Sequence, residues 1–374
     1  FKSIRFMRLV LTDFYQPIVC RFATFDLVRG EWRRYNFSLS EPGEYLTSDD
    51  DGETTFDVSA VNIEENGNRS PINYVLPPGI DQEVDNTTTS LRQQNEQSLV
   101  LKVGGLKDGD SRATYKTSDI DLRNYKRIKM FVHAEGETDL TLKDGDLACF
   151  LRLGTDFTSN YYEYEISLKP TAHGTTSPSS IWPLQNEIDI AFEIFTQTKK
   201  DRNYNSTDVS SPYIKYISGG KVTVVGNPNL SQVKTIMIGV RNPKKKLIED
   251  ADDGLSKSGQ IWVNELRLTD FDEQGGWATN SRITTRLADL GNVTLSGNMS
   301  TVGFGSIEKK VNERQKYNAY QYDFSSTLNL DKVFPENYGL KIPFYIGRSQ
   351  SVKNPHYNPL DPDILLTESL ASLD

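Results

Sequence analysis

Two Asp-Gly-Asp tripeptides have a spacing that suits a metal ion. They lie at Asp108-Gly109-Asp110 and Asp144-Gly145-Asp146. Carboxylates placed in this way can bind a weakly held structural Ca²⁺, but the same tripeptide also forms a tight turn without any ion. Turn formation alone accounts for both tripeptides, so the sequence predicts no metal site and no cofactor.

Aromatic side chains offer a second kind of chemistry, because flat rings can bind sugars. The candidates for a sugar platform are Tyr161, Tyr162, Tyr164 and Trp182. Packing in a core or at a sheet edge is the commoner role of such rings. Sugar binding therefore stays an alternative that these four residues support.

The remaining reactive residues do not form a catalytic set. The histidines His133, His173 and His356 are scattered, and His133 lies in a strand-like segment where a structural role is typical. The sequence contains no HExxH, CxxC, P-loop or GxSxG motif. A hydrolase would rest on scattered carboxylates alone, so the sequence predicts a protein that is not an enzyme.

Composition limits the classes of partner. The 374 residues suffice for two or three domains, and the net charge of −9 argues against nucleic-acid binding, which requires a basic face. Cys20 and Cys149 can form one disulfide bond or remain two buried thiols. No run approaches the ~18 apolar residues of a membrane helix. The start at Phe1, without a cleavable signal pattern, indicates an internal fragment of a longer chain.

The segment around which these residues are organised is 261–271. Apolar residues alternate along it, and the alternation slips by one position at Asn264-Glu265. This slip predicts a β-strand with a bulge. Residues 4–14 repeat the pattern, including the closing Thr-Asp-Phe. The two segments are predicted to close two equivalent β-modules, with chance similarity of short strands as the alternative.

Residues 98–272 are predicted to form a jelly-roll-like β-sandwich. Short alternating segments are separated by turns rich in Gly and Pro, as is typical of sandwiches. The predicted strands are 99–103, 112–117, 127–134, 148–153, 162–168, 221–225, 235–240 and 261–268. Residues 192–200 break this pattern and predict a short helix with a basic end, whereas 188–190 fit a strand equally well.

The pattern changes after residue 272. Residues 320–330 alternate, with Tyr320, Tyr322 and Phe324 on one parity and polar residues on the other. Eleven residues at ~3.3 Å each, tilted by ~45°, span roughly 26 Å, close to the apolar band of an outer-membrane barrel. An amphipathic strand of a soluble sandwich fits the pattern equally well. Together with segments 293–299 and 340–346, the lipid-facing candidates are Val293, Leu295, Met299, Tyr320, Tyr322, Phe324, Leu328, Leu330, Leu340, Ile342, Phe344 and Ile346.

Long blocks of the sequence resemble the SprA family, also called Sov. The blocks lie at 26–35, 58–80, 121–135, 261–278, 286–314 and 358–364, and the last reads N-P-L-D-P-D-I. The resemblance implies an outer-membrane translocon of the type IX secretion system of Bacteroidota, which some members also need for gliding motility. Members of the family form a very large single-chain β-barrel with insertions outside the barrel.

The pattern along the chain predicts four parts, and the resemblance implies the roles of the last two and a set of partners. Residues 1–40 would hold closing strands of a preceding β-module, 41–97 an irregular or extended connection, 98–272 a sandwich that caps or is inserted into the barrel, and 273–374 transmembrane strands with connecting loops. The implied partners are secreted cargo proteins, a PorV-like barrel at a lateral opening, a plug protein and outer-membrane lipid. The alternative from another class is a secreted or surface carbohydrate-binding β-sandwich protein.

Overall fold

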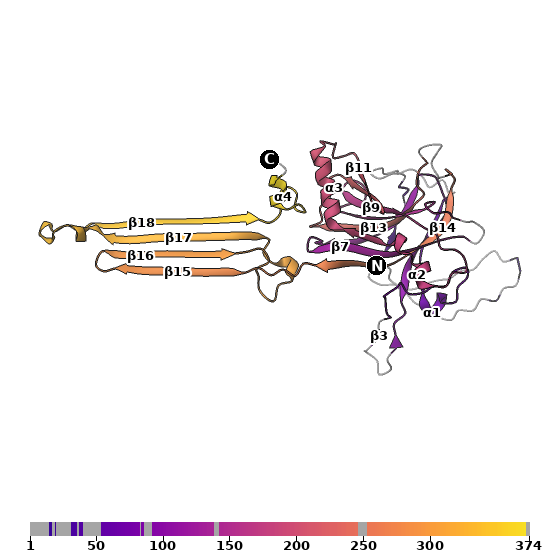
Figure 1. Ribbon diagram of the computed structural model, residues 1–374, viewed down its shortest axis with the longest axis horizontal. Coiled ribbons are helices and arrows are strands. Elements are labelled where there is room, and N and C mark those ends of the chain that lie inside the picture. The colour runs from indigo at the N-terminus through magenta and orange to yellow at the C-terminus, as the bar shows by residue number, and fades with distance from the viewer. Residues whose placement is uncertain are drawn as a thin grey trace. The chain divides into compact units, whose positions relative to one another are not determined.

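The chain divides into two compact units, Phe1–Glu31 and Trp32–Asp374. The computed structural model describes residues 15–16, 19, 31–35, 37–39, 54–82, 84–85, 92–137, 142–245 and 253–371. The second unit contains antiparallel sheets of seven, five, four and two strands (Figure 1). The predicted all-β class is confirmed.

One layer of the sandwich is a seven-stranded sheet in the order β1-β6-β13-β8-β9-β12-β11. Its strands are β1 (Arg33–Arg34), β6 (Ser111–Ile120), β8 (Ala148–Gly154), β9 (Tyr161–Ser167), β11 (Tyr213–Ile217), β12 (Gly220–Val225) and β13 (Val233–Arg241). The strand β11 was absent from the predicted set. It lies at the edge and has apolar residues on both sides, since Ile217 packs against the core while Ile214 and Tyr216 are exposed, so no alternation marks it.

The second layer is a five-stranded sheet in the order β10-β7-β14-β5-β2. Its strands are β2 (Thr55–Asn62), β5 (Gln97–Leu106), β7 (Tyr125–Gly136), β10 (Ile188–Ala191) and β14 (Lys257–Phe271). Because β2 pairs with β5 along its whole length, this sheet includes residues from the range 41–97 that was expected to be a connection. The strand β1 likewise brings residues of the range 1–40 into the sandwich.

The two sheets enclose one apolar core. Cys149, Leu151 and Val240 reach it from the seven-stranded sheet, and Leu101 and Ile261 reach it from the five-stranded sheet. All five side chains are fully buried. Burial of one such aliphatic side chain stabilises the fold by about 1.5–3 kcal/mol. The predicted β-sandwich is thus confirmed.

The central strand β14 carries the predicted bulge. Its register against β7 shifts between Asn264 and Arg267, and Glu265 has a positive φ of 54°. One extra residue at this point returns Leu266 and Leu268 to the core side of the strand. The related segment 4–14 lies outside the described residues.

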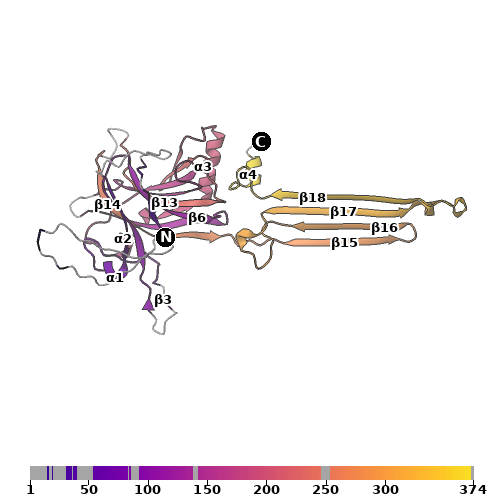
Figure 2. The same ribbon diagram turned by 180° about the vertical axis from the view of Figure 1, so that it is seen from behind.

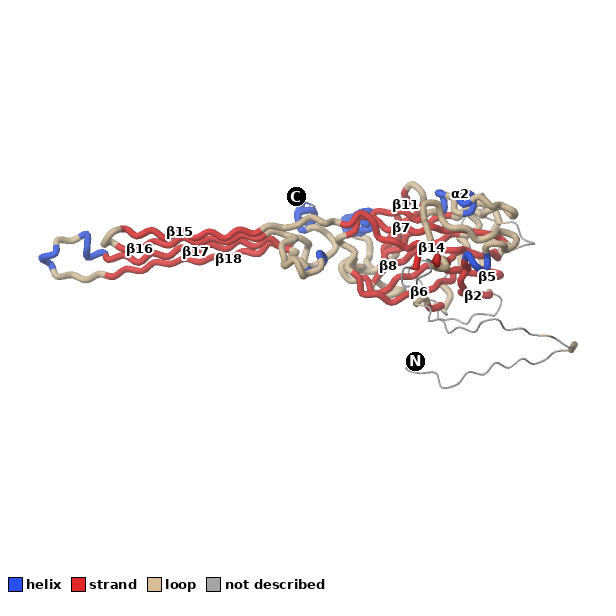
Figure 3. Tube along the Cα trace, turned by 90° about the horizontal axis from the view of Figure 1, so that it is seen from below, coloured by secondary structure: helices blue, strands red, loops and turns tan. Residues whose placement is uncertain are grey.

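Helices are short in the described part of the sandwich (Figure 3). The longest, α3 (Phe192–Tyr204), contacts β12 and β7 and buries Phe192 and Phe195 in the core. It begins at the predicted residue and continues four residues beyond the predicted end. The smaller elements are α1 (Ile63–Asn66), α2 (Pro178–Ile181), η1 (Leu184–Asn186) and the paired strands β3 (Val84–Asp85) and β4 (Arg92–Gln93).

A separate four-stranded sheet follows the sandwich in the chain (Figure 2). Its strands, in spatial and chain order, are β15 (Ala278–Leu287), β16 (Gly291–Ser300), β17 (Tyr317–Asn329) and β18 (Pro343–Pro355). The connecting and following elements are η2 (Val311–Glu313), η3 (Leu330–Val333), η4 (Glu336–Tyr338) and α4 (Leu366–Ala371). The strand β15 was not predicted, because Thr, Ser and Asn occupy five of its ten positions.

Deleting Glu265 is expected to lower the free energy of unfolding by about 2–4 kcal/mol. The residues after the deletion change face, and the half-buried Leu266 and Leu268 turn away from the core. The control Glu265→Gly keeps the extra residue and suits its positive φ, so it is expected to be neutral or to stabilise by about 1 kcal/mol. Urea unfolding measures both variants, and a deletion variant as stable as the parent would contradict this role of the bulge.

Candidate functional site: a sheet with one apolar and one polar face

The sheet β15–β18 has two faces of different polarity. Residues directly opposite each other on antiparallel strands lie on the same face. Ile283, Leu295, Phe324 and Arg348 form one such row across the four strands. Steps of two along each strand add Thr285, Leu287, Val293, Met299, Tyr320, Tyr322, Leu328, Phe344, Ile346 and Val352 to that face.

The predicted lipid-facing residues that lie in strands all fall on this apolar face. They are Val293, Leu295, Met299, Tyr320, Tyr322, Phe324, Leu328, Phe344 and Ile346. Leu330, Leu340 and Ile342 lie outside the strands, because Leu330 begins η3 and β18 begins only at Pro343. One hydrogen bond continues past the strands, because the Leu330 N–H donates to the Ile342 carbonyl at 2.9 Å.

The apolar face is open to its surroundings. Ile283 is 59% exposed, Leu295 48% and Ile346 47%. A contiguous exposed apolar surface of this kind marks contact with a membrane or another protein. Polar residues interrupt it at several places. Ser281 and Ser326 lie on this face, Arg348 lies opposite Phe324, and the Tyr322 hydroxyl donates to Oε1 of Gln350.

The other face is polar. It carries Asn280, Arg282, Arg286, Asn298, Gln321, Asp323, Ser349 and Lys353. Asn298 Nδ2 donates to Gln321 Oε1 at 3.4 Å, and Gln321 Nε2 donates to the Asp323 carboxylate at 3.2 Å. The Ser349 hydroxyl also donates to Asp323. A network of this kind suits a surface in contact with water.

Both outer strands of the sheet are open on one side. Within the described ranges, β15 pairs only with β16, and β18 pairs only with β17. Strands of 10 and 13 residues extend about 33–43 Å at ~3.3 Å per residue. Each edge therefore offers a long row of unpaired backbone groups, which is where further strands add to a sheet.

The candidate sugar-binding rings lie inside the sandwich. Tyr161, Tyr162, Tyr164 and Trp182 are each at most 4% exposed, so they cannot present a platform to solvent. The polar side of β9 is buried as well. Glu163 binds Arg152 at 2.6 Å and Arg241 at 3.0 Å. Burial raises the pKa of Glu163, but the Arg241 and Arg152 guanidiniums outweigh this effect and hold the pKa below its usual value.

The two Asp-Gly-Asp sites form turns whose carboxylates bind cationic side chains. Asp110 lies 2.6 Å from Arg112, and Asp146 lies 3.0 Å from Lys257. The glycine of each turn has a positive φ, 78° and 88°, which glycine adopts without strain. Where the structure describes the chain, it contains no group of three or more His, Cys, Asp or Glu side chains that could hold a metal ion.

His133 and Cys149 have structural surroundings. His133 is fully buried, with Nδ1 2.8 Å from the Ile181 carbonyl oxygen and its ring 4.0 Å from that of Trp262. Cys149 is a free, buried thiol whose pKa is raised by burial to about 12. Cys20 lies outside the described residues.

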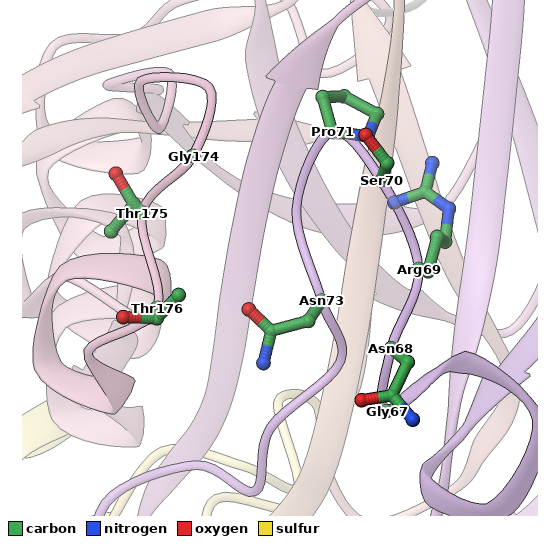
Figure 4. A pocket seen from close by; sticks show the side chains of 9 residues that line it. All are labelled: Gly67, Asn68, Arg69, Ser70, Pro71, Asn73, Gly174, Thr175 and Thr176. Atoms are coloured by element: carbon green, nitrogen blue, oxygen red, sulfur yellow. The ribbon is translucent and has the colours of Figure 1, made fainter.

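A shallow polar hollow of about 350 Å³ lies between the segment after α1 and the segment before α2 (Figure 4). Its lining consists of Gly67, Asn68, Arg69, Ser70, Pro71, Asn73, Gly174, Thr175 and Thr176. Arg69 is already engaged, because its Nη2 donates to Oε1 of the buried Glu135 at 2.5 Å. Burial raises the pKa of Glu135, but hydrogen bonds from His133 and Arg69 outweigh it and lower the pKa below its usual value.

Comparison with known proteins gives one family, and the solved structures that the chain is similar to include two carbohydrate-binding modules. The family model described as motility related/secretion protein matches residues 1–370. None of the curated proteins matches the chain. The family 11 carbohydrate-binding module of the cellulosomal cellulase Lic26A-Cel5E of Clostridium thermocellum is 12% identical, over 61% of this chain and 95% of the module, with a TM-score of 0.26.

A second structure is the family 11 module from Clostridium thermocellum in complex with a β-1,3-1,4-mixed-linked tetrasaccharide. It is 12% identical, over 62% of this chain and 94% of that module, with a TM-score of 0.26. Similarity at this level carries no argument about what the present chain binds. In the described residues, no helix has the length and apolar composition required to span a bilayer.

Replacing Arg69 with Gln is expected to lower the free energy of unfolding by about 1–3 kcal/mol at pH 7, because buried Glu135 loses a charged donor. A carboxyl group with a lowered pKa in the folded state contributes stability above its unfolded pKa and loses it as the pH falls through the folded value. The difference between parent and variant should therefore shrink below about pH 4.5. The control Lys102→Gln breaks an exposed ion pair with Glu137 and should cost about 0–1 kcal/mol.

Urea unfolding between pH 3 and pH 7 measures both differences. A loss for Arg69→Gln that stays constant across this range would show that the charge of Glu135 is not involved.

Proposed function

Because this chain belongs to the SprA family of motility-related and secretion proteins, we propose that it is part of a protein-conducting translocon in the bacterial outer membrane. In this proposal β15–β18 are a section of the wall of a large β-barrel. The observation that carries the proposal is the exposed four-stranded sheet, with one apolar face, one polar face and two open edges.

The dimensions of the sheet support a membrane position. Strands of 10–13 residues, tilted by ~45°, span about 23–30 Å, which matches the apolar band of an outer-membrane barrel. The apolar face would meet lipid and the polar face the water-filled lumen. Tyr320 and Tyr322 lie toward the end of the sheet nearest the η2 segment, and amphipathic rings are favoured near a membrane interface.

The open edges support a place inside a larger sheet. In a hydrocarbon environment each unpaired N–H or C=O group is costly, so strands that cross a membrane form closed barrels. The outer sides of β15 and β18 therefore require neighbouring strands. These would come from parts of the protein other than the described strands.

The sandwich would be a cap or an insertion of the barrel. Its partners in this proposal are secreted cargo proteins, a PorV-like barrel at a lateral opening and a plug protein, all inferred from the family. The type IX secretion pathway of Bacteroidota and a role in gliding motility are inferred in the same way. The proposed activity is transport without catalysis.

Lipid contact on one face of β17 tests the proposal. Spin labels at Phe324→Cys and Leu328→Cys, in the full-length protein in membranes, are expected to be relaxed by lipid-soluble oxygen. Labels at Asp323→Cys and Thr327→Cys are expected to be relaxed by a water-soluble nickel reagent, because these residues lie on the polar face. Equal accessibility of the two faces, or water access at position 324, would exclude a wall position for β17.

Matched arginine substitutions give an energetic test of the same assignment. Phe324→Arg places a cation on the lipid side and is expected to cost about 2–4 kcal/mol in a bilayer, whereas Thr327→Arg faces a wide lumen and should cost about 0–1 kcal/mol. Refolding titrations in lipid vesicles measure both free energies. Similar costs for the two variants would contradict the orientation of the faces.

A further inference from the structure

The segment that follows β18 returns to the sandwich and buries an aspartate there. The side chain of Asp363 is completely removed from solvent. Its carboxylate accepts a hydrogen bond from the Tyr162 hydroxyl at 2.7 Å, from Lys199 Nζ at 3.2 Å and from the Leu230 N–H at 3.3 Å. Ile364, the next residue, is also buried.

The sandwich supplies a matched site for this segment. Tyr162 belongs to β9 and Lys199 to α3, so two separate elements converge on one carboxylate. The Lys199 side chain is 1% exposed, and its ammonium group also lies 3.0 Å from Asp361 and donates to the Pro228 carbonyl at 3.0 Å. A buried charge is tolerated only when it is paired and hydrogen-bonded, and each charge here meets that condition.

A second contact lies beside the first. Arg123, in the segment between β6 and β7, binds the Asp121 carboxylate through Nε at 2.9 Å and Nη2 at 2.8 Å. Its Nη1 donates to the Pro362 carbonyl at 2.9 Å, and its guanidinium lies 4.4 Å from the centre of the Tyr357 ring. The arginine therefore holds the returning segment at two points.

The same segment of the sandwich also contacts the chain where it leaves β14 and between β16 and β17. The Asp272 N–H donates to the Asn124 carbonyl at 2.7 Å, directly after Phe271 pairs with Tyr125. Lys316, just before β17, binds Asp121. Residues 121–124 thus contact the chain as it enters the four-stranded sheet, halfway through it, and after it leaves.

We propose that residues 356–364 form a clasp that keeps the sandwich attached to β15–β18 while cargo passes through the translocon. The sandwich is then a fixed part of the translocon and not a lid that swings away. Release would require the contacts at residues 272, 316 and 356–364 to break together and would expose the buried Ile364. The inference rests on the proposed transport function and adds that the sandwich stays fixed to β15–β18 during transport.

Hydrogen exchange of the full-length protein tests the clasp without any transport assay. The reporting amides are those of Asn358, Ile364 and Leu366, which donate to the carbonyls of Ile364, Asp361 and His356. Asp363→Ala should speed their exchange at least about 10-fold, because Lys199 and Tyr162 lose their shared acceptor. The matched control Asp289→Ala changes an exposed aspartate in the turn between β15 and β16 and should leave these amides unchanged.

Amides of β8 and β13 show in the same experiment whether the sandwich stays folded. If Asp363→Ala unfolds the sandwich, the smaller change Asp363→Asn takes its place, and a roughly 3-fold or larger acceleration confined to the clasp is expected. If the sandwich of the variant stays folded and the amides of residues 358, 364 and 366 exchange at the wild-type rate, the clasp is contradicted.

A cross-link tests whether the sandwich stays attached during transport. Lys200 on α3 and Glu368 on α4 form a partly exposed ion pair of 3.1 Å. In the double variant Lys200→Cys/Glu368→Cys, a short bis-maleimide reagent should join the two positions and leave secretion in cells within 2-fold of the untreated variant. The single variant Lys200→Cys treated with the same reagent is the control.

A 10-fold or larger loss of secretion that depends on the cross-link would overturn the proposal, because it would mean that the sandwich must detach. The proposed transport function has a test of its own. If cells that lack the full-length protein secrete normally, the proposed function is wrong, and the exchange experiment still decides whether the clasp exists.

Discussion

Backbone hydrogen bonding is the constraint on which both β structures of this chain depend, since each N–H and C=O group of a strand needs a partner. The sandwich limits its open edges with short outer strands, such as β1 with two residues and β10 with four. The four-stranded sheet does the opposite. Its outer strands, β15 and β18, have 10 and 13 residues and no second neighbour among the described strands. Its edges therefore leave longer rows of unpaired backbone groups than these short outer strands of the sandwich.

The two structures use the same period-two pattern in different surroundings. In β13, Ile236, Ile238 and Val240 alternate toward a core that the other sheet covers. In β17, Tyr320 and Tyr322 alternate toward a face that is open. Alternation identifies residues that share a face, but it carries no information on what covers that face. The parity of residues 320–330 could therefore be predicted from sequence, and the choice between lipid and a second sheet could not.

Apolar patterns within a single strand could be predicted from sequence, whereas contacts between distant parts of the chain could not. The bulge in β14 was predictable from the order of its apolar residues. Ile261 and Val263 face the core before the bulge, and Leu266 and Leu268 face it afterwards, so the alternation shifts by one position in the sequence. The end of β17 was not predictable, because Leu330 continues the alternation although η3 begins at this residue. The contact between Lys199 and Asp363 joins residues 164 positions apart, and no local pattern encodes such a pair. The block 358–364 stood out only through family resemblance, and the structure brings it to the block 121–135 through Arg123 and Pro362.

That contact changes how the sandwich and the strands relate mechanically. The chain leaves the sandwich at Asp272, makes two hairpins, and returns at Tyr357 to the same short segment, residues 121–124. A pair of strands attached at one point can pivot about that point. The four-stranded sheet is attached to the sandwich through Asp272, Lys316 and Tyr357, so it has no single hinge. The buried pair of Asp363 and Lys199 adds specificity to this arrangement, because a carboxylate is satisfied only where Tyr162, Lys199 and the Leu230 N–H converge. If the chain is part of a translocon as proposed, an opening for cargo would therefore lie elsewhere than at this junction.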